Sequence, residues 1–194
     1  FGVAEDHDSN PIKMGIAKVK ERGARMIGVN PIRSGYNAVA DDWVGITPGT
    51  DGLFIMALIY ELFRAGKIDL DYLAHFTNAS VLLNGDPKSD QCGLFLRDDD
   101  GNPQVIDRRT GHLAPWNGAG VEPDLNGTYR RAGVTHAPAF HKMAERFMDP
   151  TYAPNKVADR TGIAAERIRA IAADLARVAF DEAIEVDQEW TDFR

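Results

Sequence analysis

The segment that most constrains the fold is residues 51–65, DGLFIMALIYELFRA, which has the length of an ordinary helix and almost no polar face. A surface helix keeps one polar side, so a helix that is apolar nearly all round must lie between other layers of a protein. Gly66 follows it, and glycine commonly ends helices. We therefore predict a layered fold in which this helix is buried between its neighbours.

Strand and helix patterns alternate ahead of this segment. The run ARMIGVN at 24–30 predicts a short buried strand, and WVGI at 43–46 predicts a second one. Residues 11–22 predict a helix that begins after Asn10 and ends before Gly23. Alternation of this kind favours an α/β fold. We predict an open, mainly parallel, Rossmann-like sheet flanked by helices, with a β-hairpin and loop extension.

The rest of the chain is more varied. Residues 93–111 predict a hairpin whose turn lies at 100–102, and residues 112–138 predict an ordered loop or extension. Further helices are predicted at 69–76, 139–148 and 164–179. The last of these carries apolar residues at a 3-4-3 spacing, which indicates one face packed on a core.

These patterns divide the chain into three segments. Residues 1–83 form an α/β core, 84–138 a hairpin and loop extension packed on it, and 139–194 a helical segment leading to a following domain. The chain starts at Phe1 rather than Met and stops at Arg194 without a terminal signal. We therefore expect it to be part of a longer protein.

Composition and charge narrow the function. The net charge is −7 and there is no basic block, which argues against nucleic acid as a partner. Cys92 is the single cysteine, so no intrachain disulfide or cysteine-ligated metal site is expected here. The histidines show no ligand-like spacing, and we assign no catalytic and no metal-binding residue. No apolar run approaches the ~18 residues that a membrane helix requires, so no direct membrane insertion is expected.

Three loops follow expected strand ends, at residues 2–10, 30–36 and 47–51. Open α/β sheets bind ligands outside the carboxyl ends of their strands, so these loops are the candidate site. In the first loop Gly2 follows a strand end, and Asn10 lies where a helix begins and free N–H groups attract phosphate. An ordinary polar loop with an Asn cap explains the same residues.

The other two loops carry groups suited to a nucleotide. Asn30 and Arg33 come directly after a strand, where ribose hydroxyls or a base commonly lie, although a turn with a solvated Arg fits equally well. Gly49 lets backbone approach a ligand closely, and Thr50 and Asp51 suit a helix start. Capping alone explains these residue types. The Asp51 carboxylate is also able to accept two hydrogen bonds from the N1–H and N2–H₂ edge of guanine.

Three stretches resemble the molybdopterin oxidoreductases of the dimethyl sulfoxide reductase family: GVAEDHDSNP, ERGARMIGVNPIRSGYNAVADDWVGITPGTDGLFIMAL and GKIDLDYLAHFTN. That family includes formate dehydrogenases, periplasmic nitrate reductases and sulfoxide reductases. The resemblance is dense over residues 1–80, is less specific over 84–135 and resumes at 152–176.

The resemblance implies a cofactor and a set of binding residues. Enzymes of the family bind two molybdopterin guanine dinucleotides to one molybdenum or tungsten, and one dinucleotide lies across an α/β domain of this kind. Carried over by position, the binding residues are Gly2 and Asn10 near the pyrophosphate, Asn30 and Arg33 facing the guanosine, and Gly49, Thr50 and Asp51 in the turn whose Asp reads guanine.

The resemblance also implies a parent enzyme of which this chain is one part. Two-electron oxidation or reduction of formate, nitrate, a sulfoxide or a similar small substrate is expected of the whole subunit. The 4Fe-4S cluster, the residue that ligates the metal and the second cofactor domain are expected elsewhere in it, so the chain alone is expected to be inactive. Its expected partners are those remaining domains and iron–sulfur electron-transfer subunits. An upstream signal would set the compartment, cytoplasm or periplasm.

Some features depart from the family pattern, and two other functions stay open. The first loop carries acidic EDHD and is longer than the GxNP form of many members, which leaves the contacts of its acids undefined. The chain could instead be a non-catalytic α/β interaction domain that has lost the ligand. A nicotinamide dehydrogenase is a third hypothesis, against which the absence of G-x-G-x-x-G counts.

Overall fold

The computed structural model describes residues 12–183, which fall into two compact units. Unit 1 contains residues 12–62 and 150–183, and unit 2 contains residues 63–149. Six α-helices and several small sheets occur in the described residues, so the α/β class is confirmed. None of the helices in this part of the chain is both long and apolar enough to span a membrane. The three-segment division made from sequence stays a prediction.

The strands of unit 1 form a parallel pair. β1 (Ile27–Val29) lies beside β2 (Asp42–Val44), with Gly28 opposite Trp43. Both predicted strands are confirmed, although each is shorter than its apolar run. In a parallel pair both carboxyl ends lie at one edge, so the segments after β1 and after β2 leave the sheet on the same side.

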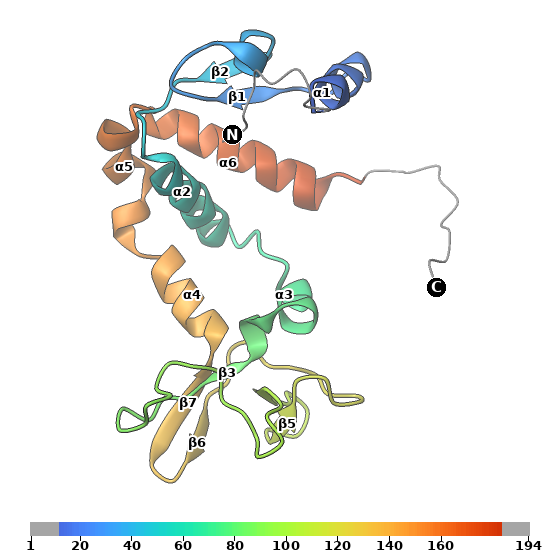
Figure 1. Ribbon diagram of the computed structural model, residues 1–194, viewed down its shortest axis with the longest axis vertical. Helices are drawn as coiled ribbons and strands as arrows, with labels where there is room; N and C mark the ends of the chain where they lie inside the picture. Colours follow the sequence, from blue (N-terminus) through green and yellow to red (C-terminus); the bar gives the residue numbers. More distant parts are fainter. Residues whose placement is uncertain (1–11, 184–194) are drawn as a thin grey trace. The chain divides into compact units, whose positions relative to one another are not determined.

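One face of this pair packs on helices. Figure 1 shows α2 (Asp51–Arg64) and α6 (Ala165–Ala176) on the same side of the strands, and α5 (Pro154–Thr161) completes the core. The buried core residues are Val44, Ile46, Phe54, Ala57, Val157, Ile163, Ile168 and Ile171. Burial of this apolar area is the main stabilising contribution to unit 1.

The helix predicted at 51–65 is confirmed as α2, but its expected burial on all sides is not. Phe54 and Ala57 are buried, whereas the side chain of Ile55 is 43% exposed. The physical reason is that α2 meets the core of unit 1 along one stripe. Its apolar surface therefore exceeds what the described core of this unit covers.

The opposite face of β1 is covered by the loop that contains the short 3₁₀ helix η1 (Gly35–Ala38). A Cβ placed on Gly28 would lie 2.3 Å from Oδ1 of Asn37 and 3.2 Å from Cβ of Ala40. Both of those side chains are buried. The loop therefore rests directly on the strand, and only glycine leaves room for it.

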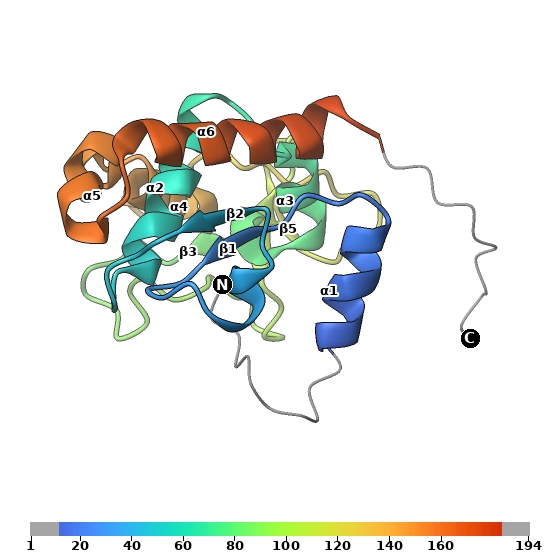
Figure 2. The ribbon, with the colours of Figure 1, turned by 90° about the horizontal axis from the view of Figure 1, so that it is seen from above.

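The helix α1 (Ile12–Glu21) confirms the prediction at 11–22, and Figure 2 shows it to one side of the strand pair. Gly23 follows it with φ +86°, a left-handed conformation that suits a residue just beyond a helix end. Lys20 Nζ donates to the carbonyl of Val39 at 2.6 Å and to Asp41 at 2.8 Å. These bonds tie the end of α1 to the loop that covers β1.

Ionic contacts join the amino ends of the strands to α6. Asp42 pairs with Arg167 of α6 and with Arg25, which lies 3.4 Å away, while Arg25 also reaches Asp174 at 3.0 Å. The groups are partly exposed, so each pair contributes about 0–1 kcal/mol. Their combined effect is to orient α6 along the sheet.

Unit 2 contains antiparallel strands and two helices. The order in one sheet is β3 (Leu82–Leu83), β7 (Val134–Pro138), β6 (Tyr129–Arg131), and β4 (Gln104–Ile106) pairs separately with β5 (Leu113–Pro115). The helices are α3 (Leu70–Phe76), capped by Asp69, and α4 (Ala139–Phe147). These two helices confirm the predictions at 69–76 and 139–148.

The core of unit 2 is aromatic in part. The ring of Phe63 stacks on Phe140 with centroids 6.3 Å apart and meets Phe147 edge-on at 5.4 Å. Ala74, Ala79 and Leu125 are buried around Phe140.

The region 84–138 differs most from expectation. The predicted turn at 100–102 exists, with Gly101 at φ +84° and Arg97 bridged to Pro103, but β4 finds its main partner in β5. The stretch predicted as a loop, 112–138, contains β5, β6 and β7. A two-residue turn joins β6 to β7, and a hairpin of this type requires positive φ at both turn positions. Ala132 occupies one of these positions with φ +50°, although alanine is not a typical turn residue.

The carboxyl-terminal helix pattern is partly confirmed. The predicted 164–179 helix is α6, followed by a π-helical turn (Arg177–Asp181). Ile168 and Ile171 of the predicted apolar face are buried, but Leu175 is 49% exposed and Val178 is 45% exposed. The apolar 3-4-3 stripe is therefore buried in its first half and about half exposed in its second half. The helix α5 was not predicted.

Asp107 organises the loop between β4 and β5 and the segment beyond it. Its nearly buried carboxylate accepts hydrogen bonds from the backbone N–H groups of Arg109 and Glu122 at 3.2 and 3.3 Å and from the Thr110 hydroxyl at 3.1 Å. Burial alone raises the pKa of Asp107, but the hydrogen bonds from Arg109, Glu122 and Thr110 outweigh it and leave the pKa below its usual value.

We predict that replacing Gly28 with Ala lowers the free energy of unfolding by about 1–3 kcal/mol, because the added methyl overpacks the contact with Asn37. Gly15→Ala is the matched control, since a Cβ there meets no atom of the described part of the chain within 4 Å. In the middle of α1 that change should stabilise by about 0.5–1 kcal/mol. Urea denaturation measures both, and equal effects at the two glycines would refute the close contact.

We predict that Asp107→Asn destabilises the chain near neutral pH and that the difference from wild type narrows in acid. The folded pKa is lowered, so this carboxylate stabilises the fold above the unfolded pKa of about 3.9, and the contribution is lost as pH falls through the folded pKa. Denaturation midpoints across acid pH measure it. The exposed neighbour Asp99, changed to Asn, is the control. A destabilisation that does not depend on pH would contradict the assigned role of charge.

Candidate functional site

Two of the three predicted loops leave the same edge of the β1–β2 pair. The backbone N–H of Asn30, directly after β1, donates to the carbonyl of Val44 at the end of β2 at 3.2 Å. The Trp43 indole N–H donates to the carbonyl of Asn30 at 3.0 Å, and its ring lies over Gly45. These contacts therefore hold together the first residues of the segments that begin at Asn30 and at Gly45.

The first predicted loop, residues 2–10, lies outside the residues that the structure describes. Gly2 and Asn10 belong to it, so their predicted contact with a pyrophosphate stays a prediction. The described part of the candidate site consists of Asn30, Arg33, Gly49, Thr50 and Asp51.

The turn at 47–50 is closed by its own hydrogen bonds. The N–H and the hydroxyl of Thr50 both donate to the carbonyl of Thr47, at 3.2 and 2.7 Å. Gly49 has φ +79°, which only glycine adopts without strain. The carbonyl of Thr50 accepts from the N–H of Phe54 at 3.0 Å, so Thr50 is the capping position and Asp51 the first residue of α2.

The described residues leave the outer side of this turn uncovered. A Cβ placed on Gly49 or on Gly52 would meet no atom of residues 12–183 within 4 Å. Asp51 is half-buried in the first turn of α2, where the leading N–H groups of a helix lack intrahelical partners. A carboxylate, the leading N–H groups of a helix and space free of described atoms thus coincide, which is what a polar ligand with both donors and acceptors requires.

The turn is anchored on the end of α5, a connection that the sequence analysis missed. The N–H of Thr47 donates to the carbonyl of Thr161 at 2.8 Å. Thr161 is fully buried, its hydroxyl donates to the carbonyl of Val157 at 3.0 Å, and it accepts from the N–H of Ile163 at 3.3 Å. The available signal was the Thr-Gly pair at 161–162, in which Gly162 has φ +72°.

The loop after β1 carries an exposed Arg33, whereas later residues of the same loop are buried. The Arg33 side chain is exposed, while Tyr36 and Asn37 of the same loop are 8% and 4% exposed. The Asn30 side chain accepts from the N–H of Ile32 at 3.2 Å, which shapes the start of the loop. Within residues 12–183, the hydroxyl of Tyr36 is the one buried side-chain polar atom without a hydrogen-bond partner.

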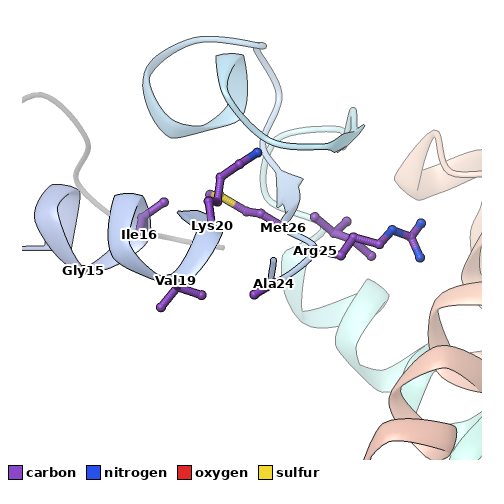
Figure 3. Close-up of a pocket in the computed structure, with 8 residues that line it drawn as sticks. Gly15, Ile16, Val19, Lys20, Ala24, Arg25 and Met26 are labelled. Atoms are coloured by element: carbon purple, nitrogen blue, oxygen red, sulfur yellow. The ribbon is translucent and has the colours of Figure 1, made fainter. Parts of the chain in front are cut away.

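A cavity of about 530 Å³ lies at the other end of β1 and is not part of this site. Figure 3 shows Ile16, Val19 and Lys20 of α1 on one side of it and residues 24–26 on the other. Its lining is mainly apolar, and the charges of Lys20 and Arg25 are engaged by Asp41, Asp42 and Asp174. No cluster of three or more potential metal ligands occurs in the part of the chain that is described.

Comparison with known proteins identifies the family. No protein-family model matches the chain. A sulfite dehydrogenase subunit of Allochromatium vinosum is 41% identical over 202 aligned residues, which cover 99% of this chain and 21% of that protein. A putative dimethyl sulfoxide reductase catalytic subunit of Halobacterium salinarum is 29% identical over 175 residues, 83% of this chain and 19% of that protein. The chain belongs to the molybdopterin oxidoreductases.

The resemblance drawn from the sequence is therefore confirmed. A formate dehydrogenase major subunit of Haemophilus influenzae is 34% identical over 79 residues, 41% of this chain and 8% of that protein. This molybdopterin oxidoreductase chain spans about a fifth of the length of the first two curated relatives.

We predict that Thr161→Val destabilises unit 1 by about 1–3 kcal/mol, because it leaves the buried N–H of Ile163 without its acceptor. The anchor of Thr47 should loosen as well, which faster hydrogen exchange of the Thr47 amide would reveal. Thr128→Val is the control, since Thr128 is exposed in unit 2. Protection of Thr47 unchanged by Thr161→Val would show that the buried hydroxyl does not support the turn.

Proposed function

We propose that this chain binds the guanosine part of a molybdopterin guanine dinucleotide within the catalytic subunit of a molybdenum or tungsten oxidoreductase. The observation that carries the proposal is the common edge of β1 and β2, from which the loops of Asn30 and of residues 47–51 both leave. Membership of the molybdopterin oxidoreductases supports the cofactor class. In open α/β sheets this edge is where nucleotides bind.

The residues at this edge fit a guanosine. The Asp51 carboxylate accepts from the two donors of the guanine edge, and the space that the described residues leave beside Gly49 and Gly52 gives the base access to it. The exposed guanidinium of Arg33 offers paired donors to ribose or phosphate oxygens. Gly2 and Asn10 complete the proposed set at the pyrophosphate.

On this proposal the cofactor and the residues of this chain have different roles. The bound cofactor supplies two-electron redox chemistry, and the residues of this chain bind and orient its nucleotide end. The second dinucleotide, the metal ligand and a 4Fe-4S cluster are proposed to lie elsewhere in the parent enzyme. On this proposal the chain contributes no catalytic residue and is inactive alone.

The substrate of the parent enzyme is proposed to be a small molecule that undergoes a two-electron change, such as formate, nitrate or a sulfoxide. Identity of 41% with a protein named for sulfite dehydrogenation adds sulfite to these candidates. The proposed partners are the remaining domains of the same polypeptide and iron–sulfur subunits that carry electrons. The relative from Allochromatium vinosum is named as one subunit of its enzyme, which supports a multi-subunit assembly.

We predict that Asp51→Asn in the full-length parent subunit lowers affinity for the cofactor roughly 10- to 100-fold, because a charge-assisted pair of hydrogen bonds becomes one neutral bond and one donor–donor clash. Guanine nucleotide released from the denatured, purified subunit measures occupancy without reference to activity. Asp71→Asn is the matched control, since Asp71 also lies in the first turn of a helix.

The outcome separates the alternatives. A non-catalytic interaction domain would carry no guanine nucleotide in either form. Equal occupancy in Asp51→Asn, Asp71→Asn and wild type would show that Asp51 does not read the base. Tight binding of NAD instead would indicate a nicotinamide enzyme.

A further inference from the structure

A pocket of about 330 Å³ lies in unit 2, beside the carboxyl end of α3. Val81 is 2% exposed and lies at its base, whereas the side chains of Phe76 and Trp116 are 73% and 37% exposed. Exposed aromatic side chains that gather around one hollow mark a binding surface, unlike apolar residues scattered singly. The lining of this aromatic pocket includes Phe76, Val81, Phe95, Arg97, Pro103 and Trp116.

Backbone hydrogen bonds hold the lining in place. The backbone of Leu96 donates to β3 at 2.7 Å and accepts from β4 at 2.9 Å, so residues 94–97 run between these two strands. The N–H of Trp116 donates to the carbonyl of Pro103 at 2.9 Å. The segments that carry Phe95 and Trp116 therefore belong to one framework. A pocket formed in advance in this way lowers the free-energy cost of binding.

Arg97 is the charged residue among those that line the pocket, and no carboxylate of the described residues pairs with it. One guanidinium N–H donates to the carbonyl of Gly101 at 2.6 Å, which leaves other donors of the group for a further acceptor. The adjacent carboxylate of Asp98 is engaged within its own turn, where it accepts from the N–H of Asn102 at 2.7 Å. Aromatic rings beside such a guanidinium suit an apolar side chain that is accompanied by a carboxylate.

The size of the pocket favours an occupant that is tethered to the chain. Eight residues line the pocket, whereas a separate protein that binds stably engages about 20–30 residues a side. A segment of the same polypeptide needs fewer contacts, because tethering raises its effective concentration to the millimolar range. A small molecule held in the pocket would leave the neighbouring face of α3 uncovered, where Tyr72 is 56% exposed and lies 5.3 Å from the Phe76 ring between centroids.

We propose that the aromatic pocket receives a segment of the parent subunit from outside residues 1–194. That segment places an apolar or aromatic side chain against Phe76 and Trp116 and pairs an Asp or Glu with Arg97. The chain spans about a fifth of the length of its first two curated relatives, so a parent of that length has ample further polypeptide. The inference rests on the parent subunit of the proposed function, but not on its cofactor.

Photo-crosslinking in the full-length parent subunit tests the contact. The change Phe76→p-benzoylphenylalanine places a crosslinker in the pocket, and mass spectrometry of the irradiated protein identifies the attached peptide. We expect a crosslink within the same polypeptide, outside residues 1–194, to a residue within a few positions of an Asp or Glu. Leu94→p-benzoylphenylalanine is the matched control, because Leu94 is 60% exposed but does not line the pocket, and it should not attach to that peptide.

Charge variants test the pairing with Arg97. Arg97→Gln removes the charge and keeps an N–H group for the carbonyl of Gly101, while Arg97→Glu reverses the charge. Each should lower the crosslink yield at position 76, roughly 3- to 10-fold for the reversal. Changing the acidic residue of the attached peptide to Lys should restore the yield in Arg97→Glu. Arg131→Glu, at an exposed position of β6, is the control and should leave the yield unchanged.

The results separate this inference from the proposed function. A crosslink to a separate subunit, to residues 1–194 or to no peptide overturns the inference, and so does a yield that Arg97→Glu leaves unchanged. Guanine nucleotide is measured in the same preparations. Nucleotide without the expected crosslink leaves the proposed function standing and shows that the docking is wrong. The expected crosslink without guanine nucleotide supports the docking and counts against the proposed function.

Discussion

The parallel pairing of β1 with β2 is the constraint on which the candidate site depends. It sends two loops from one edge, and its register decides which residues face which layer. Ile27 and Val29 pack toward the helices, so Gly28 between them faces the η1 loop. A slip of one residue would turn the glycine toward the core and place branched side chains under Asn37. The register of the pair therefore fixes both the contact of the η1 loop with Gly28 and the positions from which the two loops of the candidate site leave the sheet.

Local patterns were sufficient for the elements near this pair. The apolar runs at 24–30 and 43–46 and the helix at 51–65 could be predicted because each depends on neighbouring residues. The helix α5 could not, since its eight residues are largely polar and only Pro154, Val157 and Thr161 are buried. The β6–β7 hairpin was not predicted because its turn uses Ala132, and because YRR followed by VTHAP lacks a clean alternation of apolar and polar residues.

The same distinction applies to the site. The types and positions of Arg33, Gly49 and Asp51 could be read from sequence, because strand ends and a helix start are local signals. The hydrogen bond between Thr47 and Thr161 joins segments far apart in the chain, so no local sequence pattern predicts it.

The apolar surface left on two helices bears on how such a site would work. Ile55 of α2, Leu175 of α6 and Val178 beyond it are each more than 40% exposed, on the helices that support the candidate edge. Exposed apolar side chains on supporting helices are often covered by a neighbouring domain where they form one patch. In the proposed parent enzyme, cover from neighbouring domains would fix α2, and with it the first turn that presents Asp51. Cofactor affinity would then depend on the assembly, because the residues proposed to contact the nucleotide would be positioned by helices whose outer faces the described residues leave partly exposed.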